Sequence, residues 1–381
     1  MDTNAPCGLL RAFAELKDPR MNRTKHHPLE NILTIAICAV ICGADGCTDI
    51  AEFGRIKKDW FKTFLVMPKG IPSHDTFGRV FAALDPLAFE QCFIAWINEL
   101  AVATEGRLIA IDGKTLRRSL DQANGKAAIH MVSAWCQANH MVLGQLATDD
   151  KSNEITAIPE LLKLLDIQGA VVTIDAIGCQ KEIAAQIVDQ GGDYLLHLKG
   201  NQGTLHAETV QLFDECLRDD CHGIAYATAT TTDKDHGRIE RRKLWATSEI
   251  GWFAERGKWK NLRSLIRVEC RRTLGDKTTR DYHYFISSLP AGNARQLLTY
   301  IRGHWGVENG LHWCLDIAFA DDDRRLRTGH AAENVSRLAR IALNLLKAQT
   351  NHKVGIKLKR KCCGWSNEYL ARVLTQQNQG I

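Results

Sequence analysis

The sequence predicts an α/β protein in which an all-helical N-terminal region precedes a mixed sheet with flanking helices. Three observations lead to this prediction. Residues 1–105 carry apolar side chains at helical spacing. From residue 107 onward, short apolar runs alternate with amphipathic helical segments. Two of those runs, 108–111 and 170–174, are each followed directly by an aspartate.

The helices of the N-terminal region (1–105) are recognised by their starts. Asp85 followed by Pro86 is an N-cap with proline at the first helical position. Asp49 and Glu52 resemble a capping box at the start of another helix. Between helices lies a cationic loop that is either a solvated surface or a contact for DNA. That loop contains Arg20, Arg23, Lys25, His26 and His27.

Residues 106–202 form the first part of the predicted core. Their order of three antiparallel strands, helix, strand, helix and strand fits a ribonuclease H-like sheet. In such a sheet the first and fourth strands are neighbours, so Asp112 and Asp175 would face the same pocket. The expected strands are 107–112, 129–135, 141–146, 170–175 and 194–198, and the expected helices are 154–165 and 180–189.

Residues 203–290 break the alternation and are predicted to form a β-rich insertion after one helix, 204–217. Cations and tryptophans are interleaved there, which suits contact with nucleic-acid phosphates and bases. A lysine-rich exposed surface with buried tryptophans is the competing interpretation. The candidates for DNA contact are Arg241, Arg242 and Lys243.

Residues 291–350 return to helix and would complete the core, with 307–319 read as one helix. Residues 351–381 are expected to form a basic C-terminal tail.

Composition limits the function without deciding it. Lys and Arg number 49 against 44 Asp and Glu, so the formal net charge of +5 permits a nucleic-acid partner. The thirteen cysteines lack zinc-ligand spacing and are expected to be reduced thiols. We find no signal-peptide pattern and no apolar run long enough to span a bilayer. A cytoplasmic protein without a membrane partner is therefore expected.

The two strand-end aspartates carry the chemical interpretation. Two neighbouring carboxylates repel each other unless a cation lies between them, and hard divalent ions are held by such oxygens. Two ions about 4 Å apart can activate an attacking oxygen and stabilise a leaving one in phosphodiester chemistry. The best third carboxylate is Glu308, which opens a helix with His312 and Asp316 on the same face. Taken alone, a strand-end aspartate is more often only a turn or helix-cap residue, and Glu308 alone would be a charge that is favourable near a helix N-terminus.

Taken together, seven short segments form a specific set of motifs, and they include IDGK at 111–114 and HWGVEN at 304–309. With them, nearly the whole chain resembles a DDE-type insertion-sequence transposase of the group that includes the H-repeat-associated proteins. The segments are 18–20, 25–29, 71–77, 111–114, 174–176, 199–202 and 304–316.

The resemblance implies a ribonuclease H-like catalytic core with a β insertion between its second and third acids. It also implies Mg²⁺-dependent cleavage at transposon ends, with Mn²⁺ able to substitute, and transfer of a 3′-hydroxyl to target DNA. Asp112, Asp175 and Glu308 match the family's catalytic, metal-binding triad. The implied partners are double-stranded DNA and a second copy of the chain, because pairing two DNA ends requires at least a dimer.

One motif departs from the family. Related transposases carry a Tyr, two residues, Arg, three residues, Glu, six residues, Lys pattern around the last acid. Tyr300 and Arg302 lie near that pattern but out of register, and with Lys199 they are predicted DNA contacts, packing being the alternative. At the corresponding positions this chain has Ile301, His304, Glu308 and Leu315, so only the glutamate agrees with the pattern.

Two other functions stay open from the sequence. One is a catalytically silent DNA-binding protein derived from a transposase, and the other is a non-transposing Mg²⁺-dependent nuclease. Lys114, His304 and His312 receive no role at this point.

Overall fold

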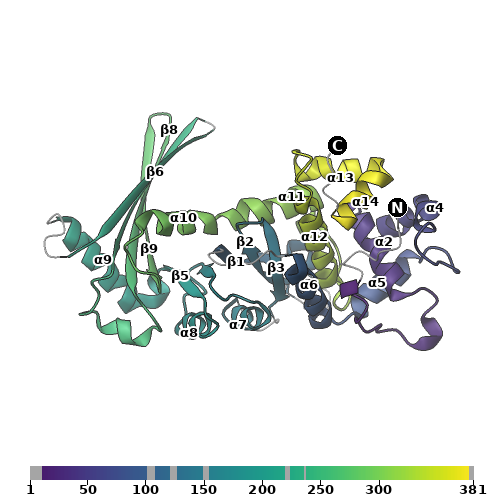
Figure 1. The fold of residues 1–381 in the computed structure, drawn as a ribbon, viewed down its shortest axis with the longest axis horizontal. Coiled ribbons are helices and arrows are strands. Elements are labelled where there is room, and N and C mark those ends of the chain that lie inside the picture. The colour runs from purple at the N-terminus through teal and green to yellow at the C-terminus, as the bar shows by residue number, and fades with distance from the viewer. Residues whose placement is uncertain are drawn as a thin grey trace.

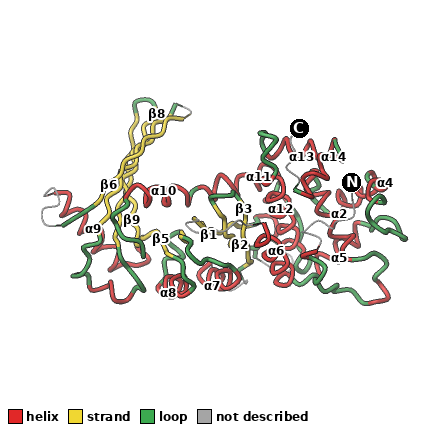
Figure 2. The backbone as a smooth tube through the Cα atoms, in the orientation of Figure 1, coloured by secondary structure: helices red, strands yellow, loops and turns green. Residues whose placement is uncertain are grey.

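The computed structural model describes residues 11–100, 108–120, 127–148, 154–218, 224–235 and 237–376. The molecule is elongated, with helices gathered at one end, a mixed sheet in the middle and a β arm at the other end (Figure 1). Nine strands form one sheet in the order β3-β2-β1-β4-β5-β9-β8-β7-β6. The backbone view shows these strands running from the centre of the molecule into the arm (Figure 2).

The N-terminal region is helical, as predicted. Asp85 caps its last helix by accepting a hydrogen bond from the Ala88 N–H at 2.7 Å. Asp49 lies inside its helix rather than at the start, and its carboxylate accepts from the Gly46 N–H at 3.1 Å. The helices are α2 (Leu29–Cys42), α3 (Cys47–Ile56), α4 (Lys58–Phe61), α5 (His74–Ala83) and α6 (Pro86–Leu100).

The five strands of the core have the predicted ribonuclease H-like order. Strand β1 pairs antiparallel with β2 and parallel with β4, where Ile111 lies opposite Ile174. The parallel register places the next residues, Asp112 and Asp175, side by side at the C-terminal end of the paired segments, which we call the sheet edge. The strands are β1 (Leu108–Thr115), β2 (His130–Cys136), β3 (Met141–Ala147), β4 (Val171–Ile174) and β5 (Asp193–Leu198).

The insertion extends the core sheet instead of forming a separate one. Helix α9 (Gly203–Arg218) leads into four long antiparallel strands, and the last of them pairs antiparallel with β5. Away from the core these strands project as an exposed arm (Figure 1). The strands are β6 (Ala227–Asp235), β7 (Arg238–Thr247), β8 (Ser264–Leu274) and β9 (Lys277–Ser287).

Helices pack on both faces of the core sheet. One buried apolar cluster joins the helical end to the sheet, and Phe93, Trp135 and Leu346 belong to it. The expected helix 307–319 is divided into a π-helical turn, Glu308–His312, and a separate α-helix. The helices are α7 (Glu154–Leu164), α8 (Lys181–Asp189), α10 (Ala294–His304), α11 (Trp313–Phe319) and α12 (Ala331–Ala348).

The segment expected to be a basic tail instead folds into α13 (Ile356–Trp365) and α14 (Asn367–Thr375). Two of its cations are buried because they satisfy carbonyl groups at the C-terminal ends of other helices. Arg360 donates to the Val40 carbonyl of α2 at 2.7 Å, and Lys359 donates to the Leu346 carbonyl of α12 at 3.0 Å. These bonds join the C-terminal helices to the core.

Two expectations about composition can be compared with the described residues. Ten cysteines are free, but Cys216 is disulfide-bonded, so the expectation of reduced thiols is wrong there. No single helix in the described part of the chain has both the length and the apolar character to cross a membrane.

Candidate metal centre

Asp112 and Asp175 are held at the sheet edge by backbone hydrogen bonds. The Asp112 carboxylate accepts from the Gly113 N–H at 2.9 Å. Asp175 directly follows β4 and accepts from the N–H groups of Ile177 at 3.1 Å and Gly178 at 3.4 Å. The first strand does not end at Asp112 as predicted but continues to Thr115, so Asp112 lies within a hydrogen-bonded strand.

Glu308 reaches this edge from the π-helical turn between α10 and α11. Such turns insert an extra residue into a helix and occur often at functional sites. His312 ends the same turn, and its Nδ1 lies 3.6 Å from Asp112 Oδ2 and 3.9 Å from Glu308 Oε2. One ligand atom from each of these three residues lies within 4.8 Å of the others.

Three glycines allow this helical segment to approach the sheet closely. A Cβ on Gly303 would lie 2.2 Å from a methyl group of Leu108, and a Cβ on Gly306 would lie 2.1 Å from the Gln137 amide oxygen. A Cβ on Gly310 would lie 2.7 Å from the indole of Trp135. At Gly303 and Gly306 the end of a flexible side chain could move aside, whereas at Gly310 the rigid indole would force the turn that carries Glu308 to shift.

Burial and neighbouring acids raise the pKa values of Asp112 and Asp175. Burial is the largest cause and raises the pKa of Asp112 to about 7, with further contributions from Glu308, Asp175 and Glu154. Burial and Glu154 raise the pKa of Asp175 as well, against the effect of its two backbone hydrogen bonds and Lys199. The edge therefore holds negative charge that the protein leaves largely uncompensated.

Nearby basic side chains are paired with other acids. Lys114 follows Asp112 by two residues, yet its ammonium lies 2.7 Å from Asp316 and 2.9 Å from Asp322. His130 Nε2 lies 2.6 Å from Glu154 Oε1. Sequence reasoning missed Glu154 because an acid in the first turn of a helix usually indicates only a favourable dipole interaction.

His304 and His312 occupy different environments. His304 Nδ1 lies 3.0 Å from the Thr173 hydroxyl on β4, and burial lowers its pKa to about 4. It packs α10 against the sheet, outside the three-residue cluster. Burial, together with Arg340 and Lys114, lowers the pKa of His312 to about 3. Its imidazole is therefore neutral and supplies no positive charge to the carboxylates.

This donor set fits a divalent cation. Asp112 and Glu308 offer hard carboxylate oxygens, Asp175 lies at the same edge, and the neutral imidazole of His312 offers a nitrogen. The pKa of Asp112, which burial and then the neighbouring acids Glu308, Asp175 and Glu154 raise, is also consistent with a cation site, since a bound cation would stabilise the charged carboxylate.

Comparison with known proteins identifies the family. A model described as "Transposase DDE domain" matches residues 103–345, and one described as "DDE_Tnp_1-associated" matches residues 10–97. The chain belongs to the DDE transposase family. This family implies a divalent metal at its acidic residues.

Relatives of this DDE transposase match it along almost its full length. A protein of Escherichia coli O157:H7 described as "Putative transposase YncI" is 41% identical, covering 96% of this chain and 94% of its own. The "H repeat-associated putative transposase YhhI" of E. coli K12 is 40% identical, with coverages of 96% and 97%. A cryo-EM structure of the piggyBac transposase synaptic complex with hairpin DNA matches with 12% identity and a TM-score of 0.43, covering 97% of this chain and 76% of that one.

The predicted DNA contacts of this DDE transposase differ in exposure. Lys199 and Arg241 are exposed, and Lys199 lies close enough to Asp175 to lower its pKa. Arg242 is largely buried and pairs with Asp233 at 2.8 Å and with Glu240. Their contact with DNA stays a prediction.

The other three candidates also have partners within the protein. Lys243 Nζ lies 4.6 Å from the ring centre of Trp245. The buried Tyr300 accepts a hydrogen bond from Gln296. Arg302 pairs with Asp233 of β6 at 2.8 Å, which joins the helix before Glu308 to the arm. Their DNA contacts likewise remain predictions.

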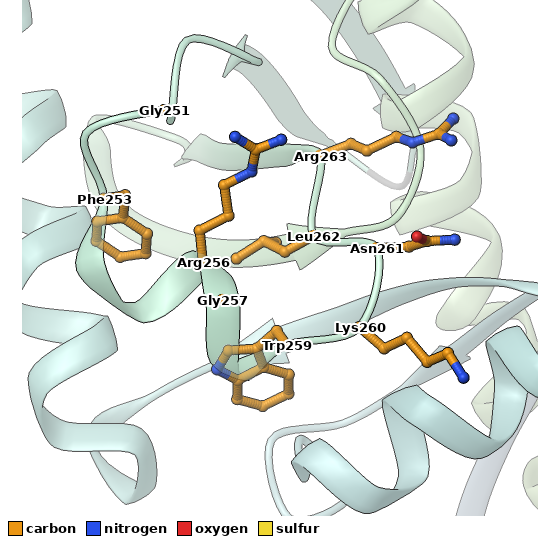
Figure 3. Close-up of a pocket in the computed structure, with 9 residues that line it drawn as sticks. All are labelled: Gly251, Phe253, Arg256, Gly257, Trp259, Lys260, Asn261, Leu262 and Arg263. Carbon is orange, nitrogen blue, oxygen red and sulfur yellow. The ribbon is translucent and has the colours of Figure 1, made fainter.

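A hollow of about 670 Å³ lies away from the acids, in the loop between β7 and β8 (Figure 3). Arg256, Lys260 and Arg263 contribute charge to its lining, and Trp259 and Phe253 contribute rings. None of the three candidate acids lines this hollow, so it is separate from the metal centre.

Proposed function

We propose that this DDE transposase is an active enzyme that cleaves DNA at transposon ends and joins the freed 3′-hydroxyl to target DNA. The observation that carries the proposal is that Asp112 and Glu308, from distant parts of the chain, lie together with His312, while Asp175 follows the neighbouring parallel strand. Asp112 and Asp175 follow paired positions of parallel strands, and Glu308 arrives from the helical segment packed on that sheet.

Asp112, Asp175 and Glu308 would hold Mg²⁺, or Mn²⁺ in its place. Bound divalent ions supply activation of the attacking oxygen and stabilisation of the leaving oxygen. The Asp112 side chain is partly shielded from solvent, which limits the water that competes for its carboxylate, and backbone N–H groups orient Asp175. These residues are therefore preorganised, which is the main contribution that a protein makes to phosphoryl transfer.

Double-stranded DNA is the proposed partner, bound through exposed cations. Lys199 lies beside Asp175, where a phosphate approaching the acids would contact its ammonium. Arg241 extends the positive charge along the arm. Two DNA ends must be paired for strand transfer, so a homodimer is proposed in the DNA complex.

The test measures nicking of a transposon-end duplex in Mg²⁺ by the full chain. Asp112→Asn, Asp175→Asn and Glu308→Gln are each expected to abolish nicking while binding of the duplex is retained. Asp323→Asn is the control, because Asp323 is an exposed acid paired with Arg118 outside the cluster.

The same experiment separates the two alternative functions. Binding without cleavage by the wild-type chain in both Mg²⁺ and Mn²⁺ would identify a silent DNA-binding protein. Cleavage without any strand-transfer product would identify a nuclease. Wild-type nicking by Asp112→Asn would remove Asp112 from the proposed triad.

A further inference from the structure

His312 is a buried imidazole whose nitrogens make no ordinary hydrogen bond within the described chain. The residue is only 7% exposed, and its Nε2 is buried without a hydrogen-bond partner among the described residues. Its Nδ1 is directed at the acids, 3.6 Å from Asp112 and 3.9 Å from Glu308. These distances exceed those of a hydrogen bond. A buried polar group of this kind requires an explanation.

Two neighbouring histidines are satisfied by protein groups instead. His130 Nε2 lies 2.6 Å from Glu154, and its Nδ1 lies 2.9 Å from the Thr115 hydroxyl. His304 is paired with Thr173. Of these three imidazoles, His312 alone directs a nitrogen into the acidic cluster.

The distances from His312 to the two carboxylates suit a shared cation. Oxygen and nitrogen ligands lie about 2.0–2.2 Å from ions of this size, so two atoms on one ion can be at most roughly 4.4 Å apart. The distances from His312 Nδ1 to Asp112 and to Glu308 both fall inside that limit.

The π-helical turn explains how the two helical ligands come together. Glu308 and His312 are its first and last residues, so their side chains project toward the same edge of the sheet. Gly310 between them lets the turn rest on Trp135. The backbone is therefore fixed close to β2 at the point where both ligands are presented.

We propose that His312 is a nitrogen ligand of the divalent ion that Asp112 and Glu308 hold, so that this site is not an all-oxygen one. The inference rests on the proposed function, because it takes a divalent ion at these acids as given. An imidazole ligand favours Mn²⁺ and later transition metals over Mg²⁺, which prefers oxygen. His312 would thus set the metal preference of the enzyme.

The test uses Mn²⁺ as the probe, bound to the full wild-type chain and observed by pulsed electron paramagnetic resonance. Coupling of the Mn²⁺ electron spin to a ¹⁴N nucleus is expected, and labelling the histidines with ¹⁵N should replace it with a ¹⁵N coupling. The labelling arm needs no substitution, so it is informative even if a variant fails to fold.

A substitution then assigns the coupling to one residue. His312→Asn is expected to abolish the nitrogen coupling and to weaken Mn²⁺ binding by roughly tenfold, with a smaller loss for Mg²⁺. His304→Asn is the matched control, since it changes a buried histidine whose Nδ1 faces Thr173, and its coupling should remain.

The possible failures are distinguishable. Mn²⁺ bound to the wild-type chain without nitrogen coupling, or coupling that persists in His312→Asn, would overturn the assignment of His312 and leave the triad intact. Absence of Mn²⁺ binding to the wild-type chain would overturn the metal-dependent function together with it.

Discussion

The ammonium of Lys114 lies 2.7 Å from the carboxylate of Asp316. Lys114 follows Asp112 by two residues in strand β1, so this ion pair joins β1 to helix α11. The same ammonium lies 2.9 Å from Asp322, and the Lys114 side chain is only 8% exposed. One buried cation therefore compensates two acids and fixes the helix that follows Glu308 and His312. Lys114 thereby holds in place the segment that carries the candidate metal ligands.

Lys114→Met is expected to reduce the free energy of unfolding by about 2 kcal/mol, because it leaves Asp316 without its cation, whereas Asp322 keeps Arg117 at 3.3 Å. Urea denaturation of the metal-free protein measures this loss. Arg118→Met is the matched control, since Arg118 and Asp323 form an exposed pair at 3.4 Å, and it should cost less than about 1 kcal/mol. Equal losses in the two variants would contradict the structural role of Lys114.

The raised pKa of Asp112 predicts a pH-dependent cost to stability. The ordinary value of 3.8 applies to the unfolded chain, and the folded value is about 7. Between these values the folded state binds more protons than the unfolded state. Stability of the metal-free protein should therefore fall as the pH rises through this window, and the full cost remains above pH 7.

Asp112→Asn removes this cost and should stabilise the metal-free protein by about 4 kcal/mol at pH 8, with less than half of that gain at pH 5. Urea denaturation in a chelator at the two pH values measures the difference. Asp323→Asn should show no such pH-dependent gain, because Asp323 is an exposed acid. A gain for Asp112→Asn of the same size at both pH values would show that the carboxyl does not carry the predicted charge.

Gly310→Ala should disturb the metal centre through packing. Its Cβ would lie 2.7 Å from the Trp135 indole, so the turn must shift and the protein should lose about 1–3 kcal/mol of stability. Mn²⁺ affinity should fall with it, because Glu308 and His312 belong to the same turn. Gly257→Ala is the control, since its added Cβ would have no neighbour within 4 Å. Unchanged Mn²⁺ affinity in Gly310→Ala would separate the turn from the metal site.

The salt dependence of end-DNA binding tests the predicted phosphate contacts. Lys199→Ala and Arg241→Ala should each reduce the slope of log K against log salt by about one. Lys163→Ala on α7 is the control, because Lys163 is exposed and paired with Glu160. An unchanged slope for Arg302→Ala would assign Arg302 to its ion pair with Asp233 rather than to DNA.

The position of Asp112 and Asp175 at the sheet edge was predictable because it follows from short sequence patterns around each residue. The apolar runs before Asp112 and Asp175 indicate buried strands, and the element order indicates which strands are neighbours. The extension of β1 to Thr115 was not predictable in this way. Gly113 and Lys114 have no strand pattern of their own and are held by pairing with Val132 and Met131.

The features that the sequence did not predict depend on contacts between residues that are far apart in the chain. The π-helical turn depends on how closely Gly310 packs on Trp135. The C-terminal helices were read as a tail because Lys359 and Arg360 resemble solvent-exposed charges. In the structure their partners are carbonyl groups of α12 and α2, far away in the sequence. The role of His312 likewise requires knowing where Asp112 and Glu308 meet.

The pairing of β9 with β5 gives the arm a geometric consequence. Five strand spacings of about 4.8 Å, roughly 24 Å in all, separate β1 from β7 in one continuous sheet. A duplex bound by Arg241 on β7 would therefore be held at a fixed distance from a phosphate that lies at Asp112. The continuous sheet would fix the distance between the two contacts. The cleaved phosphate would then lie a constant number of base pairs from the segment bound by Arg241, whatever the sequence between them.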